Sequence, residues 1–564
     1  FKKQFFVAPT AGRAKHRASG VLRRHCPTKL AALRIGVQRA TSLMTRAFKA
    51  SVAFGRRRVP WIGFREASNQ TGAREVVLDQ LRCPLWTADC AAGALPPGIL
   101  ISINAAGARN SRNAVMYIQK LAASERAVPR YTSYPTAPHF GPAVNGQTYG
   151  AWLESLPGSA ALSFYLHVPF CQQLCHYCGC NTKAVRQAAP VDAYAAVLSR
   201  EIELVAARTG CRGISHLHWG GGTPSILGPD RLRALVGALD ARFDLTPLHE
   251  HAIELDPRFV NRELVGALTD IGVNRVSLGV QEFSPKVQQA IGRIQPFEVV
   301  ERAVGTLREA GLTHINIDLM YGLPGQSAED VRRSVMLAHD LRPQRFAVFG
   351  YAHVPWFKPH QKLIDDAALP GSALRIAQAR AAHEALTELG YVPIGLDHYA
   401  TPDDSIAVAS RDGRLRRNFQ GYTTDRGDAL LGLGTSAIGQ MPQGFVQNAP
   451  ATANYSRAIM AGELATVRGI ALSDEDRIRS RIISDIMCNM ACNLEQFADA
   501  GQASGCPSFA SELAELMPFV SDGLVRIEDR HISVTEAGRP YLRLIAAAFD
   551  AHLAQSRARH SLAV

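Results

Sequence analysis

Four of the eleven cysteines of this 564-residue chain lie within ten positions, in the stretch HVPFCQQLCHYCGCN (167–181). Cys171, Cys175 and Cys178 have the spacing CxxxCxxC. Three thiolates this close can hold one metal centre, and a 4Fe–4S cluster with only three protein ligands keeps one iron open for chemistry. Cys180 is then either a fourth ligand or a reactive thiol that stands apart from the cluster.

A structural zinc site on the same four cysteines is the alternative. Structural zinc sites usually pair two knuckles from separate parts of the chain. Here only Gly179 separates Cys178 from Cys180, so four ligands in one loop would be awkward and the loop favours an iron–sulfur cluster. Clustered cysteines in a long chain also predict metal or redox chemistry in a reducing compartment, hence a cytoplasmic protein.

The formal net charge of +13 is not spread evenly along the chain. Residues 1–115 contain 20 Lys and Arg against 4 Asp and Glu, which leaves 42 basic and 45 acidic residues for the remainder. The charge therefore does not predict nucleic-acid binding by the whole protein. No run of roughly eighteen uncharged apolar residues occurs, so no membrane span is predicted.

The basic segment 1–115 shows no sustained apolar period. We expect a disordered or non-native extension there, with an organelle-targeting leader as the alternative. Met116 would be a natural start for the protein that follows.

From about residue 160 the sequence alternates short apolar, β-branched runs with longer segments of helical period. This alternation predicts parallel βα units, in which functional residues lie at the carboxyl ends of the strands. The expected strands are 162–168, 214–220, 250–255, 275–281, 314–322, 345–354 and 391–400, and 191–210 and 296–312 are expected helices. After about 470 the pattern predicts a helix at 478–498, then a hairpin and a final helix within 522–549. That order is typical of a small winged-helix-like unit, which we interpret as a packing domain.

CxxxCxxC directly after a predicted strand resembles the signature of the radical S-adenosylmethionine (SAM) enzymes. The similarity extends further, because eight motifs appear in the order found in the oxygen-independent coproporphyrinogen III oxidase family. They are RYTSYPTAPHF (130–140), YLHVPFCQQLCHYCGCN (165–181), HWGGGTPSIL (218–227), IELDPR (253–258), VSLGVQEF (276–283), INIDLMYGLPGQ (315–326), RRNFQGYTT (416–424) and LLGLGTSAIG (430–439). The resemblance covers about 116–564.

The resemblance implies an α/β protein with a partial (β/α) radical-SAM barrel at 161–465. An N-terminal segment with the RYTSYPT motif precedes it at 116–160, and a small, mainly helical, winged-helix-like C-terminal domain follows at 466–564. The implied cluster ligands are Cys171, Cys175 and Cys178, and Cys180 is implied to be the catalytic thiol.

By the same resemblance, a larger set of residues would contact one of two SAM molecules: Tyr165, Tyr177, Gly221, Gly222, Thr223, Glu254, Gln281, Arg293, Asp318, Ala352 and Ile438. Some of these have plainer explanations. Tyr165 could be a core tyrosine, and Ala352 and Ile438 match by position only. Glycines let a backbone approach a ligand closely, but GGG alone is also an ordinary loop. Glu254 stands in an apolar run, where a carboxylate is costly without a partner.

Five basic side chains could pair with substrate propionates, because guanidinium groups suit carboxylates: Lys183, Arg186, Arg258, Arg416 and Arg417. Surface salt bridges are the alternative for each of them.

The implied reaction converts coproporphyrinogen III to protoporphyrinogen IX by oxidative decarboxylation of two propionates. Two SAM molecules are consumed, and an external donor supplies electrons to the 4Fe–4S cluster of a monomeric enzyme. A related haem chaperone is the first alternative, but such proteins usually lack the fourth cysteine and the RYTSYPT segment. The second alternative is a radical SAM methyltransferase that opens the haem ring. The intact N-terminal motif and C-terminal domain argue against this alternative.

Overall fold

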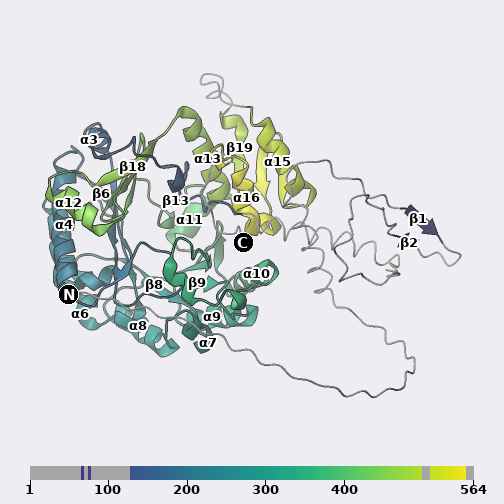
Figure 1. The fold of residues 1–564 in the computed structure, drawn as a ribbon, viewed down its shortest axis with the longest axis horizontal. Helices are drawn as coiled ribbons and strands as arrows, with labels where there is room; N and C mark the ends of the chain where they lie inside the picture. Colours follow the sequence, from purple (N-terminus) through teal and green to yellow (C-terminus); the bar gives the residue numbers. More distant parts are fainter. Residues whose placement is uncertain (1–64, 69–73, 78–126, 498–507, 554–564) are drawn as a thin grey trace, which may run out of the picture. The chain divides into compact units, whose positions relative to one another are not determined.

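The computed structural model describes residues 65–68, 74–77, 127–497 and 508–553 (Figure 1). The chain divides into two compact units, Phe1–Ala108 and Arg109–Val564. In the first unit the described residues form an antiparallel pair of strands, β1 (Arg65–Ser68) and β2 (Arg74–Val77). The rest of the expected basic extension at 1–115 lies outside the described residues.

The second unit is built on a twelve-stranded sheet whose centre is parallel. Neighbours follow the order β15-β3-β6-β7-β8-β9-β10, and every pair in this run is parallel. The bounds are β3 (Leu162–Val168), β6 (Ile214–Gly221), β7 (Glu250–Leu255), β8 (Arg275–Gln281), β9 (His314–Tyr321), β10 (Arg345–Gly350) and β15 (Ala429–Leu433). The strands predicted between 162 and 354 are confirmed as parallel strands, although the one predicted at 345–354 ends at Gly350.

Antiparallel strands extend the sheet at both ends, so it stays open as a partial barrel. On one side follow β16 (Ile438–Met441), β17 (Gly444–Asn448) and β18 (Thr466–Ala471). On the other, β12 (His398–Ala400) pairs antiparallel with β10 and with β11 (Val392–Ile394). The prediction of one strand at 391–400 is wrong, because Gly395 adopts a φ of +54° and reverses the chain.

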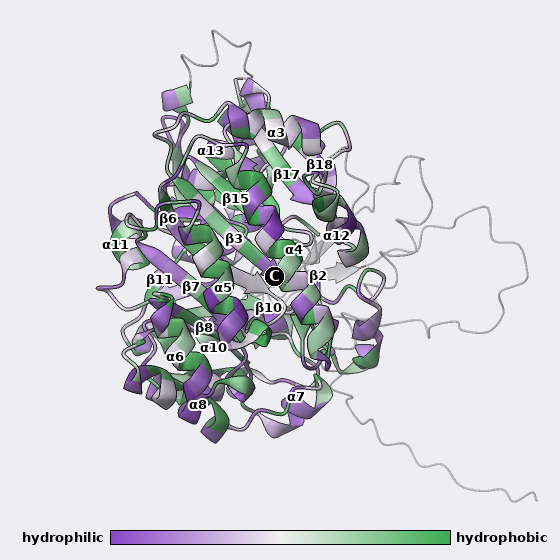
Figure 2. Ribbon diagram, turned by 90° about the vertical axis from the view of Figure 1, so that its left-hand side faces the viewer, coloured by the Kyte–Doolittle hydropathy of each residue, from purple (hydrophilic) through white to green (hydrophobic). Residues whose placement is uncertain are grey.

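Helices follow the strands and cover the outer face of the sheet (Figure 1). Their apolar faces pack on the central strands, whose own side chains are largely buried; Figure 2 shows the mixture of polar and apolar residues on α6 and α8. The bounds are α3 (Gly146–Glu154), α4 (Ala188–Ala206), α5 (Gly228–Asp240), α6 (Arg262–Asp270), α7 (Pro285–Ala290), α8 (Phe297–Glu309), α9 (Ala328–Asp340), α10 (Ser372–Glu388), α11 (Ser405–Arg411) and α12 (Thr452–Met460). The two predicted helices are confirmed as α4 and α8.

Local sequence explains where several of these helices begin. Ser327 accepts a hydrogen bond from the Asp330 N–H, and the Asp330 carboxylate accepts one from the Ser327 N–H, which makes a capping box at the start of α9. Asn261 caps α6 through the Leu264 N–H at 2.9 Å.

The C-terminal domain combines helices with a three-stranded sheet in the order β19-β21-β20. Its elements are α13 (Asp474–Asn489), β19 (Ala491–Asn493), α15 (Ala510–Ser521), β20 (Val525–Glu528), β21 (His531–Val534) and α16 (Leu542–Ala547). The predicted hairpin and final helix are confirmed. The predicted helix at 478–498 is wrong beyond Asn489, because Met490 adopts a left-handed φ of 54° and the chain continues as β19.

The RYTSYPT segment packs against this domain. Val128, Tyr131 and Tyr134 belong to the apolar core of the C-terminal domain. The Tyr131 hydroxyl donates to Asp550 Oδ2 at 3.0 Å. Among the helices that the structure describes, none combines the length and apolar character needed to cross a membrane.

Candidate active site

A cavity of about 530 Å³ opens at the carboxyl ends of the parallel strands. It is the place where barrel folds gather functional residues from separate strands. Most of the predicted site residues line it: Cys171, Cys175, Tyr177, Cys178, Cys180, Gly221, Gly222, Thr223, Glu254, Gln281, Arg293, Asp318 and Ala352. Tyr165 and Ile438 are not among its lining residues.

The cysteine loop begins at β4 (Phe170–Cys171) and ends at β5 (Lys183–Ala184), which pairs with β4. All four thiols are free. The Thr223 hydroxyl donates to Cys171 Sγ at 3.4 Å, and Thr182 Oγ1 lies 3.2 Å from the same sulfur. A hydrogen bond from the Cys180 thiol lowers the pKa of Cys178 to about 7.

The three thiols Cys171, Cys175 and Cys178 are free and line the large cavity. The thiolates of a 4Fe–4S cluster bind separate irons, so three thiols along one loop at a cavity fit such a cluster.

Arg293 places a buried cation beside the proposed ligands. Its Nη1 lies 3.5 Å from Cys175 Sγ and donates to Asp256 Oδ2 at 3.1 Å, and its Nη2 donates to the Gly279 carbonyl at 2.5 Å. Its Nε is buried and has no hydrogen-bond partner among the described residues. A thiolate-bound, electron-rich cluster would be stabilised by this positive charge.

Side chains from a 3₁₀ helix at Pro359–Leu363 and its N-cap hold the cysteine loop from outside. Gln361 Nε2 donates to the Tyr177 carbonyl at 2.8 Å, and His360 Nε2 donates to the Cys178 carbonyl at 2.7 Å. Lys358 Nζ donates to the Cys180 carbonyl at 2.8 Å. Sequence reasoning missed these three residues, because nothing in their local spacing indicates a partner some 180 positions away.

The glycines at the end of β6 are required by close packing. A Cβ on Gly221, whose φ is +111°, would lie 2.5 Å from the His167 ring. A Cβ on Gly222 would lie 2.5 Å from the Phe170 carbonyl oxygen. The Gly221 N–H donates to Glu254 Oε2 at 3.2 Å, so this turn also supplies the partner that the Glu254 carboxylate needs.

Asp318 lines the cavity. It accepts hydrogen bonds from Ser277 at 3.1 Å and from Asn316 at 2.7 Å. Burial, together with the nearby Glu254 charge, raises the pKa of Asp318 to about 7. This residue can therefore carry a proton near neutral pH.

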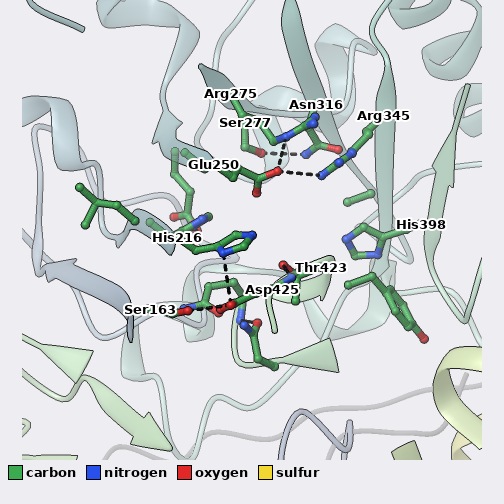
Figure 3. A pocket seen from close by; sticks show the side chains of 18 of the residues that line it. Ser163, His216, Glu250, Arg275, Ser277, Asn316, Arg345, His398, Thr423 and Asp425 are labelled. Carbon is green, nitrogen blue, oxygen red and sulfur yellow. Dashed lines mark hydrogen bonds and ion pairs between the residues drawn. The ribbon is translucent and has the colours of Figure 1, made fainter. Parts of the chain in front are cut away.

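Asp318 also lines a smaller cavity of about 170 Å³, most of whose labelled residues come from the barrel strands (Figure 3). In its lining Arg275 Nε lies 2.8 Å from Glu250 Oε2, and His216 Nδ1 lies 3.3 Å from Asp425 Oδ1. The Arg275–Glu250 ion pair offsets part of the cost of placing these two charges inside the barrel.

Tyr165 and Ile438, which do not line the cavity, belong to β3 and β16. The Tyr165 hydroxyl lies 3.0 Å from His167 Nδ1, and its ring stacks on His218 with centroids 5.9 Å apart. Ile438 begins β16 and pairs with Gln447 of β17. Their contacts with SAM stay predictions.

The structure separates the five basic residues expected for the propionates. Lys183, Arg186 and Arg416 are exposed and do not line the cavity. Arg258 is held in an ion pair with Asp256 at 2.7 Å, as the salt-bridge alternative expects. Arg417 alone of the five lines the cavity; its guanidinium lies 4.7 Å from the Tyr422 ring centroid, and it donates to the Arg130 carbonyl at 3.2 Å.

Comparisons with known proteins agree with this geometry. The radical SAM superfamily model matches residues 165–338, and the HemN C-terminal domain model matches 472–541. An oxygen-independent coproporphyrinogen III oxidase of Bradyrhizobium diazoefficiens is 49% identical over 445 residues, which are 78% of this chain and 98% of that protein. The one of Escherichia coli K12 is 38% identical over 427 residues, 76% of this chain and 93% of that protein.

A solved structure is also similar. The coproporphyrinogen III oxidase HemN of Escherichia coli, described as a radical SAM enzyme, superposes with a TM-score of 0.71 at 37% identity. The match covers 76% of this chain and the whole of that chain. The predicted fold class, a partial radical-SAM barrel with a C-terminal domain, is confirmed, and so is the implied use of a 4Fe–4S cluster and SAM. The chain belongs to the oxygen-independent coproporphyrinogen III oxidase family of the radical SAM superfamily.

Proposed function

We propose that this protein converts coproporphyrinogen III to protoporphyrinogen IX without oxygen, by oxidative decarboxylation of two propionate side chains. The observation that carries the proposal is the group of three free thiols, Cys171, Cys175 and Cys178, at the edge of a 530 Å³ cavity that the strand ends enclose. Family membership supports the same reaction.

Cys171, Cys175 and Cys178 would hold the 4Fe–4S cluster. A reduced cluster with one open iron supplies the electron that cleaves SAM and so provides a 5′-deoxyadenosyl radical for hydrogen abstraction. Around it, the protein positions its ligands and excludes water. Arg293 would balance the negative charge of the thiolates from 3.5 Å away.

The residues assigned to SAM remain a proposal that their position supports. Glycine backbone at Gly221 and Gly222 lets a ligand approach closely, and Glu254 offers a carboxylate to hydroxyl or amino groups. Gln281, Arg293, Asp318 and Ala352 line the same cavity, as binding of two adjacent SAM molecules would require.

Cys180 is proposed to act on the substrate. It is exposed at the cavity, two residues after a ligand, and its thiol contacts Cys178. At that rim a thiol can orient a propionate or pass a hydrogen atom.

We also propose a monomeric, cytoplasmic enzyme that receives electrons from a separate donor. Support for a reducing compartment comes from the described cysteines, which are all free. The domain limits 116–160, 161–465 and 466–564 and the character of 1–115 stay part of this proposal.

The deciding experiment is anaerobic reconstitution with iron and sulfide, followed by an assay of porphyrin products and 5′-deoxyadenosine. We expect protoporphyrinogen IX together with 5′-deoxyadenosine. Tight haem binding with no porphyrinogen turnover would instead identify a haem chaperone and overturn the proposal.

A further inference from the structure

An acidic residue lies where two cavities of the barrel unit meet. A second cavity of about 480 Å³ adjoins the proposed active site. The two cavities share Arg130, Gly350, Tyr351 and Asp397 among their lining residues. A ligand that extends from the cluster cavity into the second one therefore passes beside the Asp397 side chain.

The fold holds Asp397 firmly in this position. It lies in the turn between β11 and β12, and its backbone carbonyl accepts a hydrogen bond from the Val348 N–H of β10 at 2.7 Å. Its carboxylate Oδ1 lies 2.8 Å from His398 Nδ1. The side chain is 13% exposed, so it is partly open to the cavities and otherwise enclosed.

Asp397 differs from neighbouring acids in its partners. Asp256 lies 3.1 Å from Arg293 in the first cavity, and Glu536 lies 2.8 Å from Arg539 in the second. Within residues 127–497 and 508–553, Asp397 forms an ion pair with a histidine but with no lysine or arginine. A carboxylate has about four acceptor sites, so much of its hydrogen-bonding capacity is left for a ligand.

The Asp397 carboxylate is ionised at neutral pH. Burial disfavours the charged form, but the hydrogen bond and charge of His398, with the charges of Arg417 and Arg130, lower the pKa of Asp397 to about 2. An ionised carboxylate is an acceptor only, and its hydrogen bonds with N–H donors are stronger than those between neutral groups.

Aromatic rings and a leucine also line the two cavities. They are Phe349 and Phe419 in the first cavity, Tyr321, Leu396 and Tyr399 in the second, and Tyr351 in both. Ligand sites commonly combine such apolar walls with a few polar groups that fix orientation. An anion in these surroundings matches a ligand with an apolar, ring-shaped body and N–H donors within the ring.

We propose that the Asp397 carboxylate accepts hydrogen bonds from the pyrrole N–H groups of the tetrapyrrole and so positions the ring at the boundary of the two cavities. The inference rests on the proposed function and deepens it, because it assigns a residue to the centre of the substrate rather than to its propionates.

The chemistry of the ring makes this contact selective for the reduced substrate. A porphyrinogen has four pyrrole N–H donors and no acceptor nitrogen, and its saturated bridges let the pyrroles tilt so that several N–H groups point to one face. In the oxidised porphyrin two of the nitrogens have lost their hydrogen, and the ring is planar. Asp397 would therefore favour coproporphyrinogen III over coproporphyrin III, although the two carry the same propionates.

The test compares the affinities of these two compounds. Anaerobic equilibrium dialysis against the reconstituted full-length protein, without a reductant for the cluster, measures binding in the absence of turnover. Both compounds are quantified as porphyrin fluorescence after oxidation. We expect Asp397→Asn to weaken coproporphyrinogen III binding by about ten- to a hundredfold and coproporphyrin III binding by less than about threefold.

Asp366→Asn is the matched control. The Asp366 carboxylate lies 2.8 Å from His353 Nε2, so it also forms an aspartate–histidine pair, but it lines neither cavity. Both affinities should stay unchanged. If Asp397→Asn does not retain the cluster, Asp397→Glu and Asp397→Gln carry the same comparison. These two side chains have the same shape and differ in charge, so Asp397→Glu should bind coproporphyrinogen III more tightly.

Equal affinity losses for the two compounds, or an unchanged affinity for coproporphyrinogen III, would overturn the inference. An unchanged affinity together with normal turnover would leave the proposed function intact. Selective loss of coproporphyrinogen III binding in Asp397→Asn, when the wild-type protein has no decarboxylase activity, would refute the proposed function but retain the role of Asp397.

Discussion

The four loop cysteines differ in their surroundings. Cys171 contacts two threonine hydroxyls, Cys175 is buried beside Arg293, and Cys178 accepts a hydrogen bond from Cys180. Cys175 is buried and Cys171 and Cys178 are half-buried, whereas Cys180 is exposed at the cavity. Their roles can therefore be separated by single substitutions.

Replacing Cys175 by Ala should abolish cluster assembly, because two remaining thiolates from CxxxCxxC cannot hold a three-ligand centre. Iron and sulfide content and the thiolate-to-iron absorption band of the reconstituted protein measure this. Cys211→Ala is the control: Cys211 is also buried, but its thiol donates to the Pro157 carbonyl at 2.9 Å, away from the loop. A full 4Fe–4S spectrum in Cys175→Ala would refute the ligand assignment.

Cys180→Ser should assemble a normal cluster and lose most porphyrinogen turnover. The physical reason is that the Cys180 thiol is exposed at the cavity two residues past a proposed ligand, so it could act on a substrate while an open iron would be kept for SAM. Iron content and turnover are measured on the same preparation. Full activity would reduce Cys180 to a small packing residue, and loss of iron would make it a fourth ligand.

At the scale of elements, the end of β6 depends on how closely it packs against β3. A side chain at Gly221 would have to adopt a φ of +111° and overlap the His167 ring. The backbone strain and the steric overlap would both arise in the turn that places Gly221, Gly222 and Thr223 at the cavity. The stability of this element and the shape of the site are therefore coupled.

We expect Gly221→Ala to destabilise the protein by about 1–3 kcal/mol and to weaken SAM binding. Urea unfolding and equilibrium dialysis with labelled SAM check the two effects. Gly237→Ala is the matched control, because Gly237 lies in the exposed part of α5 with nothing within 4 Å of a new Cβ. It should stabilise α5 by about 0.5–1 kcal/mol. A Gly221→Ala protein as stable as wild type would contradict the packing argument.

For the whole molecule, Glu201 links α4 to the antiparallel edge of the sheet. Its carboxylate accepts hydrogen bonds from the Gly434 N–H at 2.6 Å, from Asn448 at 2.7 Å and from the Tyr455 hydroxyl at 2.7 Å. It is 2% exposed, and burial raises its pKa from the ordinary 4.5 to about 7. Between pH 4.5 and about pH 7, the Glu201 carboxyl group is therefore protonated in the folded protein and ionised in the unfolded chain.

The contribution of Glu201 to folding stability should therefore fall as pH rises from about 4.5 to 7, by up to about 3 kcal/mol. Glu201→Gln carries no titratable proton, so its urea midpoint should rise relative to wild type between pH 5 and pH 7.5. If the urea midpoints of the wild-type protein and of Glu201→Gln change in parallel between pH 5 and pH 7.5, Glu201 does not titrate in that range.

Local sequence is enough to predict the thiol loop and most of the barrel strands. CxxxCxxC predicts thiolate ligation through residue type and short spacing, and the apolar runs at 162–168 and 275–281 indicate buried strands, because both features are local. The predictions of one strand at 391–400 and one helix at 478–498 were wrong because Gly395 and Met490 adopt positive φ angles. Each ends a strand or helix although the apolar pattern of the sequence continues past it.

Which basic side chains lie at the cavity depends on tertiary packing. Arg258 has the residue type for a propionate but is paired with Asp256, whereas Arg417 lines the cavity and donates to the Arg130 carbonyl. Lys358, His360 and Gln361 likewise hold a cysteine loop that is far away in the sequence. The physical reason is that a charge or donor takes its partner from whatever folding brings within a few ångströms. That neighbourhood depends on how the strands and the C-terminal domain pack, and no local pattern records it.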